Sequence, residues 1–517
     1  MSHDSRHSPV HPLGEQPPIE QGYTPAPTTL DTWAGPVRVE WDSTAPLTPF
    51  GQLPFFIEYL KVAGLFDALA ADCPLAYTSP YASEKRDVLG TTMFSVLAGH
   101  KRYAHITALR NDAVLPELLG MKKIVSEDAV RRGFKAIGED EGGPWLQRHL
   151  DYCTAPLLSE PWVLDMDSTV KPLYGHQEGA VPGYNPKKPG RPSHVYHTYT
   201  MAGLRLVLDV DVTAGNQHAS SHAAPGLWAL LDRIPRDCWP ALLRGDSGFG
   251  TEGVMREAEQ RGLPYLFKLR LTANVKKLIK KTFSKADWTN AGQGWQGRTD
   301  TLRLEGWSRQ RGVVILRRRL KEGLAVAGRD DAGQLALGFV EIEGQSEVYE
   351  YGVLVTSIEE EVLALAQLYR DRSDSENPFD ELKNQWGWAG FVTRDLARCR
   401  LMARFIALIY NWWSLFVRLA EPDKHLEAIT SRPLLLTAIA ERTRHARQTT
   451  LKVASSHAKA GWVANVLRDI ARFLNELTQS AEQLTPDQRW RRILAHAVRS
   501  WLGGRSLRAP PRLMASA

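Results

Sequence analysis

Residues Tyr369–Lys383 read YRDRSDSENPFDELK, and this stretch decides how the rest of the chain is interpreted. It places Tyr369, Arg372, Glu376 and Lys383 in the spacing Y-x2-R-x3-E-x6-K. On a helix that turns by about 100° per residue, these four side chains fall within an arc of roughly 60°. A carboxylate flanked by two cations on one helix face is typical of a site that holds a metal ion and grips phosphates.

The same charge pattern also fits a solvent-exposed amphipathic helix with i,i+4 ion pairs. In that alternative, the two cations would pair with Glu376, Asp380 or Glu381 and would contribute little beyond stability. Pro378 is incompatible with a regular helix interior, so we expect the helix to restart near Glu376 with Pro378 in its first turn.

Two segments upstream place acids at the ends of apolar runs. In VLDMDST, Asp165 and Asp167 alternate and therefore point to the same face of a predicted strand. In LLRGDSGFG, Asp246 follows an apolar strand and is itself followed by Gly248 and Gly250. Positions where a strand gives way to a loop are the usual place for chemistry in open α/β sheets.

The segments DST, GDSGF and Y-x2-R-x3-E-x6-K, in this order, closely resemble the DDE transposases of bacterial insertion sequences. The resemblance covers about residues 162–388, and the NPKKPGRP loop and a G-N-x-H segment fit the same pattern. It implies that Asp167, Asp246 and Glu376 are the catalytic residues and metal ligands. Asp167 is preferred because the family places its acid directly before Ser-Thr, and Asp165 stays open as the alternative ligand.

The resemblance also implies an RNase H-like core in which the three acids bind two Mg²⁺ or Mn²⁺ ions about 4 Å apart. Water would free a 3′-hydroxyl at each transposon end, and this hydroxyl would then attack target DNA in line. Tyr369, Arg372 and Lys383 would contact the DNA backbone near the scissile bond. The implied partners are double-stranded DNA, as terminal inverted repeats and as target, and a second copy of the chain in a homodimer.

Two rival functions remain compatible with the same residues. One is a metal-dependent nuclease of the same fold that cuts DNA without joining it, and the other is a non-enzymatic DNA-binding protein with a decayed site. The loop Pro186–Pro192 contributes Lys187, Lys188 and Arg191, which are similar to minor-groove-binding basic motifs. A rigid hairpin loop is the alternative for this loop.

Charge and cysteine content agree with a DNA-binding protein of the bacterial cytoplasm. The net charge is +6, and from Glu421 onward 16 Lys and Arg stand against 8 Asp and Glu, so the excess base lies at the C-terminal end. The four cysteines are far apart and predict neither zinc nor disulfides. The first residues lack the apolar core of a secretory signal, and we expect a nucleoid-associated cytoplasmic protein.

Hydrophobic periodicity predicts an α/β protein, with an RNase H-like mixed-sheet core interrupted by an antiparallel β insertion and flanked by helical N- and C-terminal regions. Trp288, Trp295 and Trp307 in the insertion are expected either to stack on a flipped base or to pack on the sheet. The expected regions are a disordered tail (1–40), a helical DNA-end-binding region (41–160), the first part of the catalytic core (161–271), the β insertion (272–357), the second part of the core (358–420) and a basic helical region for DNA binding or dimerisation (421–517).

Overall fold

The structure is a computed structural model, and the residues it describes are 26–42, 44–77, 79, 81–185, 188–217, 219–320 and 349–507. For residues 219–220 and 373–377 it describes the backbone alone. Residues 321–348 of the expected β insertion and the expected DNA contact Lys187 fall outside these ranges.

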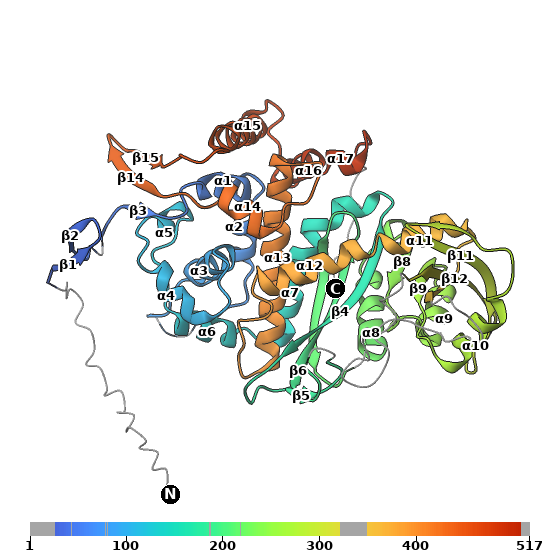
Figure 1. The fold of residues 1–517 in the computed structure, drawn as a ribbon. Helices are drawn as coiled ribbons and strands as arrows, with labels where there is room; N and C mark the ends of the chain where they lie inside the picture. Colours follow the sequence, from blue (N-terminus) through green and yellow to red (C-terminus); the bar gives the residue numbers. More distant parts are fainter. Residues whose placement is uncertain are drawn as a thin grey trace, which may run out of the picture.

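A ten-stranded mixed sheet forms the larger part of the core (Figure 1). Its strand order is β10-β11-β12-β13-β9-β8-β4-β6-β5, with β7 paired to β6. Strands β4, β8 and β9 run parallel, and the other neighbours are antiparallel, which confirms the prediction of a mixed α/β sheet. The strands are β4 (Val163–Pro172), β5 (Val181–Pro182), β6 (Pro192–Met201), β7 (Leu206–Ala214), β8 (Leu242–Gly245), β9 (Tyr265–Lys268), β10 (Thr289–Gly292), β11 (Trp295–Leu302), β12 (Arg311–Arg319) and β13 (Tyr349–Thr356).

The strands of the expected β insertion extend the core sheet rather than forming a sheet of their own. Strand β13 pairs with β9, where Leu354 lies opposite Lys268, so β10 to β13 continue the hydrogen-bonded ladder outward. The insertion opens with a helix that the sequence interpretation missed, α10 (Ala273–Thr282). Val275 and Ile279, four residues apart, bury its apolar face, as in an ordinary amphipathic surface helix.

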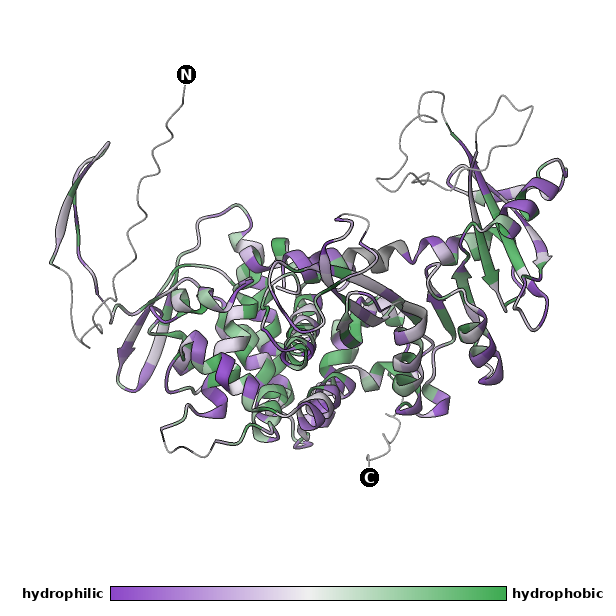
Figure 2. Ribbon diagram, turned by 90° about the horizontal axis from the view of Figure 1, so that it is seen from below, coloured by the Kyte–Doolittle hydropathy of each residue, from purple (hydrophilic) through white to green (hydrophobic). Residues whose placement is uncertain are grey.

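A bundle of helices packs beside the sheet around α13 (Leu396–Ala420), which runs through the middle of the molecule (Figure 1). This helix is apolar on all sides and is buried along nearly its whole length against β7 and α7. Hydrophobic residues line the interior of the bundle and the strands of the sheet (Figure 2). The bundle helices before the sheet are α1 (Leu53–Val62), α2 (Leu65–Ala71), α3 (Lys85–Leu97), α4 (Ile106–Leu109), α5 (Leu115–Leu118), α6 (Glu127–Ala136) and α7 (Glu139–Thr154).

The remaining helices cover the sheet or lie toward the C-terminus. They are α8 (Ala219–Asp232), α9 (Glu252–Gln260), α11 (Val362–Arg370), α12 (Ser373–Asn384), α14 (Ala428–Leu435), α15 (Ala460–Gln479), α16 (Pro486–Ala497) and α17 (Arg499–Leu502). Helix α11 packs on β9 to β12 and closes a second, smaller apolar core on that face. Among the described residues, every helix is too short or too polar to cross a membrane.

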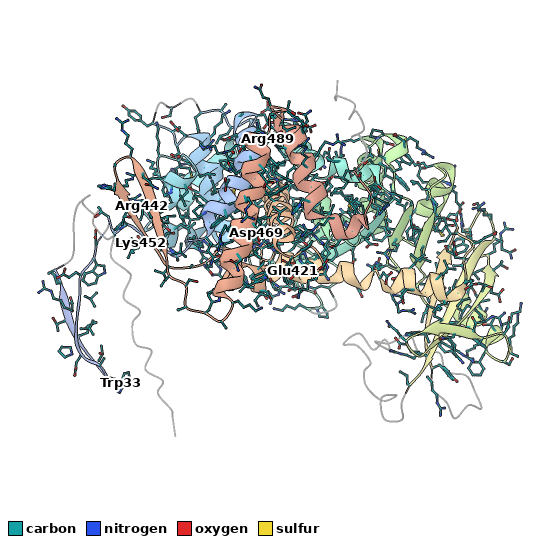
Figure 3. The ribbon with its side chains drawn as sticks, turned by 90° about the horizontal axis from the view of Figure 1, so that it is seen from above. Trp33, Glu421, Arg442, Lys452, Asp469 and Arg489 are labelled. Carbon is teal, nitrogen blue, oxygen red and sulfur yellow. The ribbon has the colours of Figure 1, made fainter. Side chains whose placement is uncertain are left out.

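Two hairpins occur where the sequence predicted none. Part of the expected disordered tail forms β1 (Thr28–Thr32) and β2 (Gly35–Val39), which lie away from the body (Figure 1). In the C-terminal region that was expected to be basic and helical, β14 (Ala440–His445) and β15 (Gln448–Val453) form a basic hairpin that is joined to β3 (Leu47–Thr48). Figure 3 labels Arg442 and Lys452 on this hairpin, where Arg442 pairs with Glu117 at 2.7 Å.

The signature stretch does not form one continuous helix. Helix α11 ends at Arg370, and α12 begins at Ser373, three residues before the expected restart at Glu376. Pro378 therefore lies inside α12 rather than in its first turn, at the cost of one backbone hydrogen bond. Tyr369 is on α11 whereas Glu376 is on α12. The prediction that these residues share one face of a single helix was therefore wrong.

Candidate active site on β4 and β8

Strands β4 and β8 are neighbours in the sheet and run parallel, with Asp165 opposite Arg244 and Met166 opposite Gly245. The next residues, Asp167 and Asp246, therefore come side by side. Asp246 follows the last residue of β8, but β4 continues past Asp167 to Pro172, so the strand-end position that the sequence predicted was wrong for Asp167. Main-chain amides hold one carboxylate oxygen of each acid. The Ser168 amide donates to Asp167 Oδ1 at 2.7 Å, and the Gly248 amide donates to Asp246 Oδ1 at 2.8 Å.

Behind these two acids lies a buried ion pair. Arg244 Nε and Nη2 each donate to one carboxylate oxygen of Asp165 at 2.7 Å, and the Arg244 Nη1 donates to the carbonyl of Leu368 at 2.5 Å. The side chains of Asp165 and Arg244 are 1% and 4% exposed. Asp165 shares its strand face with Asp167, as the alternation predicts, but both of its oxygens bind Arg244. This arrangement favours Asp167 over Asp165 as a ligand.

Arg372 is the cation that binds Asp167 directly. Its Nη2 donates to Asp167 Oδ2 at 2.7 Å, and its side chain is 6% exposed. Burial lowers the pKa of Arg372, but the charge of Asp167, followed by smaller contributions that include Asp246 and Asp165, outweighs burial and raises the pKa overall. The guanidinium is therefore within electrostatic reach of Asp165, Asp167 and Asp246.

Lys383 holds the other end of α12 on the same strand. Its Nζ donates to the Thr169 hydroxyl at 3.0 Å and to the Val170 carbonyl at 3.1 Å. The alternative pairing of these cations with Glu381 is not found, because Glu381 accepts hydrogen bonds from Trp386 and His425. Arg372 and Lys383 thus fasten α12 along β4.

Glu376 is the fourth residue of α12, one turn beyond Arg372, and its backbone lies on the segment that Arg372 and Lys383 fasten to β4. Its side chain is outside the described atoms. Within the described part of the chain, no three acidic, histidine or cysteine side chains form a metal-binding group. Asp167 and Asp246 still fit a divalent ion of the Mg²⁺ type, because both present hard carboxylate oxygens oriented by backbone amides.

The other expected DNA contacts lie at the far end of the sheet. Lys188 and Arg191 both stand over the Tyr174 ring, with the Arg191 guanidinium carbon 4.8 Å from the ring centroid and the Lys188 Nζ at 5.1 Å. Tyr174 is itself exposed, so this aromatic and basic cluster faces solvent.

The three tryptophans of the insertion meet arginines of the same sheet. The guanidinium carbons of Arg317 and Arg318 lie 3.9 Å and 4.9 Å from the centroids of Trp288 and Trp295. Trp307 is buried. Packing on the sheet therefore accounts for Trp307, while Trp295 also lines an open pocket of about 950 Å³ between β13, α11 and α17.

The sequence analysis did not identify Arg244 on β8 or Lys171 on β4, which lie on the same face of the sheet as Asp165 and Asp167. The signal for Arg244 was present in RGDSG, since an arginine two residues before Asp246 points to the same face of the strand. Lys171 is buried, and its Nζ donates to the Gly390 carbonyl at 2.5 Å. Burial lowers the pKa of Lys171 to about 8.

Fold and site together define an α/β protein that gathers acids and two arginines at its parallel strands β4 and β8. The chain matches the family "Transposase DDE domain group 1" over residues 56–475, which is most of its length. It therefore belongs to the DDE transposases of this group, and membership implies a polynucleotidyl transferase in a family that generally depends on divalent metal ions.

Two further comparisons complete this result. A cryo-EM structure of a piggyBac transposase synaptic complex with hairpin DNA aligns with 87% of this chain and 86% of its own, at 10% identity and a TM-score of 0.34. Similarity at that level carries no argument about this chain. No curated protein matches the chain.

Proposed function

We propose that this transposase cuts DNA at the ends of a bacterial insertion sequence and joins the freed 3′-hydroxyl to target DNA. Asp167, Asp246 and Glu376 are its metal ligands, and the expected ions are two Mg²⁺ or Mn²⁺. The observation that carries the proposal is the side-by-side position of Asp167 and Asp246 on parallel strands, with the helix of Glu376 fastened along one of them.

The residues of the chain divide the work between them. When bound, the two ions would supply a nucleophile at neutral pH and stabilise the leaving oxygen. The backbone amides of Ser168 and Gly248 hold the carboxylates of Asp167 and Asp246 in fixed orientations, so little reorganisation accompanies binding. Arg372 offsets the repulsion between these acids until a phosphate and ions arrive.

We propose DNA contacts at two places. Lys188 and Arg191, together with Lys187 of the same loop, contact the backbone of the duplex through their positive charges. The cluster of Lys188 and Arg191 on Tyr174 faces solvent and is therefore accessible to DNA. Arg372 lies where the scissile phosphate would meet the acids, and its planar fork suits a phosphate as well as a carboxylate. Tyr369, near the end of α11, and Lys383, near the end of α12, are the other two proposed DNA contacts beside the acids.

The function is tested with pre-cut DNA ends. Purified protein, Mg²⁺, a linear terminal repeat with a free 3′-hydroxyl and a supercoiled plasmid should yield covalently joined products. The same protein should cut an uncut end, and Asp246→Asn should do neither. Cutting without joining would replace the proposal by a nuclease of this family, and neither activity in the wild type would leave a DNA-binding protein with a decayed site.

The proposed assembly is a homodimer on paired DNA ends in the bacterial cytoplasm. Light scattering of the protein with and without terminal-repeat DNA measures the assembly directly. A complex of one chain with one DNA end, and no species that holds two chains, would contradict it.

A further inference from the structure

We propose that Arg244, acting with Asp165, is a positioning residue that sets the relative places of the three acids. This inference rests on the proposed function for what the acids bind. The geometry that supports it does not depend on any ligand, because it consists of contacts within the chain.

The guanidinium of Arg244 links the two strands that carry Asp167 and Asp246 to the end of α11, the helix that precedes the helix of Glu376. Arg244 itself belongs to β8, two residues before Asp246. Its Nε and Nη2 bind Asp165 on β4, two residues before Asp167, and its third bond goes to Leu368 at the end of α11. The ion pair between Arg244 and Asp165 therefore lies two residues before Asp246 on one strand and two residues before Asp167 on the other.

The bond to Leu368 explains how the third acid is placed. At the break between the helices, the Asp371 amide donates to Gln367, and the Arg372 amide donates to Tyr369. The Leu368 carbonyl between these acceptors is taken by Arg244 Nη1 at 2.5 Å. A helix end leaves carbonyls without intrahelical partners. Arg244 therefore binds the chain at the point where it turns from α11 into α12.

Stability alone is a weak reason for such a pair. Two charges buried to this degree lose hydration energy comparable to their attraction, and apolar replacements of similar volume are often neutral or stabilising. A forked, buried cation does specify geometry, because its three bonds can be made only when β4, β8 and α11 are correctly placed. Removing the pair should therefore change the relative positions of the acids more than the free energy of unfolding.

The test is the double variant Asp165→Leu, Arg244→Met, which removes one charge of each sign. Long-range electrostatics alone would leave Mn²⁺ binding nearly unchanged in this charge-balanced variant. Positioning predicts Mn²⁺ affinity at least tenfold weaker by calorimetry, and at least tenfold faster amide exchange over residues 369–384 in the metal-free protein. The wild type, measured in parallel, provides the reference for both readouts.

A matched control lies in the same sheet. Arg311 is also buried, and it binds Glu259 at 2.7 Å and Glu252 at 2.5 Å, both on α9 rather than on β4, β8, α11 or α12. The variant Glu259→Leu, Arg311→Met should keep wild-type Mn²⁺ affinity and wild-type exchange over residues 369–384. Equal weakening of Mn²⁺ binding in both double variants would overturn the proposal, because the effect would then be general loosening of the sheet.

Arg244→Lys keeps the test decisive if the double variant does not fold. Lysine keeps the charge but lacks the fork, so positioning again predicts weaker Mn²⁺ binding and faster exchange. Wild-type values for both in Arg244→Lys, or in a folded double variant, overturn the proposal. A wild-type protein that binds no Mn²⁺ defeats the proposed metal site instead, and the exchange measurement then decides the positioning role alone.

Discussion

Replacing Arg372 by alanine gives the most informative single perturbation of the site. The change removes the partner of Asp167, in an ion pair whose two side chains are 6% and 16% exposed. Breaking a buried pair in this way costs about 3–5 kcal/mol. We expect the lower end, about 3 kcal/mol, because Asp167 keeps some exposure and its bond from the Ser168 amide. The melting temperature should fall by roughly 3 °C, because a chain of 517 residues has a large entropy of unfolding.

The same change should tighten the binding of a divalent ion. Removing a positive charge beside Asp167 and Asp246 strengthens their attraction for a dication, so Mn²⁺ affinity should rise on the order of tenfold or more. Mn²⁺ should therefore raise the melting temperature of Arg372→Ala more than that of the wild type. Thermal melts in EDTA and in Mn²⁺, together with calorimetric titration, measure both effects.

Arg370→Ala is the matched control for this prediction. Arg370 lies two residues earlier and donates to the Ala291 carbonyl and to Gln367 rather than to the acids. Its loss should cost about 1 kcal/mol and leave Mn²⁺ affinity unchanged. The reasoning is refuted if Arg372→Ala is as stable as this control in EDTA, or if it binds Mn²⁺ no more tightly than the wild type.

Further perturbations test the remaining assignments. Asp246→Asn should abolish Mg²⁺-dependent cleavage while DNA-end affinity in mobility shifts stays within about twofold, and wild-type cutting would remove this acid from the ligands. Lys188→Ala and Arg191→Ala should each lower the salt slope of DNA binding by about one, as binding over a KCl series would show. Lys383→Ala should lower that slope equally if the amine meets phosphate, and should leave it unchanged if the amine only fastens α12. Lys171→Met should stabilise the protein at pH 7 by roughly 1–3 kcal/mol. Because the folded pKa of Lys171 is about 8 against 10.5 for an ordinary lysine, the unfolded chain binds more protons between these values, and wild-type stability rises with pH there. The advantage of the variant should shrink in melts from pH 7 to pH 10, and a constant difference would contradict the prediction.

The acids could be located from sequence because their signals are local. Asp167 and Asp246 each follow an apolar run of strand character, and alternation assigns the strand face without knowledge of partners. Arg244 could be placed on that face by the same rule, but its pairing with Asp165 depends on the register between β4 and β8. Register depends on how two strands align with each other, so it cannot be read from the hydrophobic pattern of either strand alone.

Two local signals misled the interpretation for different reasons. Pro378 indicated a first-turn position, but contacts of Arg372 and Lys383 with β4 support a helix that already began at Ser373. The β14–β15 hairpin turns at Ala446 and Arg447, both with positive φ (46° and 67°), where glycine or asparagine would have marked a turn. Tertiary contacts override propensity in the first case, and an atypical turn sequence conceals the hairpin in the second.

The late position of α13 in the chain has a consequence for synthesis. Residues 396–420 form the central helix on which α7 and β7 pack, so both present bare apolar surface to the cell until that segment leaves the ribosome. Nascent chains arrested near residue 395 should be protease-sensitive, and those arrested some 40 residues beyond Ala420 should be resistant, since the ribosomal tunnel holds the last residues. A gene copy truncated before α13 would then yield a polypeptide destined for degradation rather than a defective competitor for the intact enzyme.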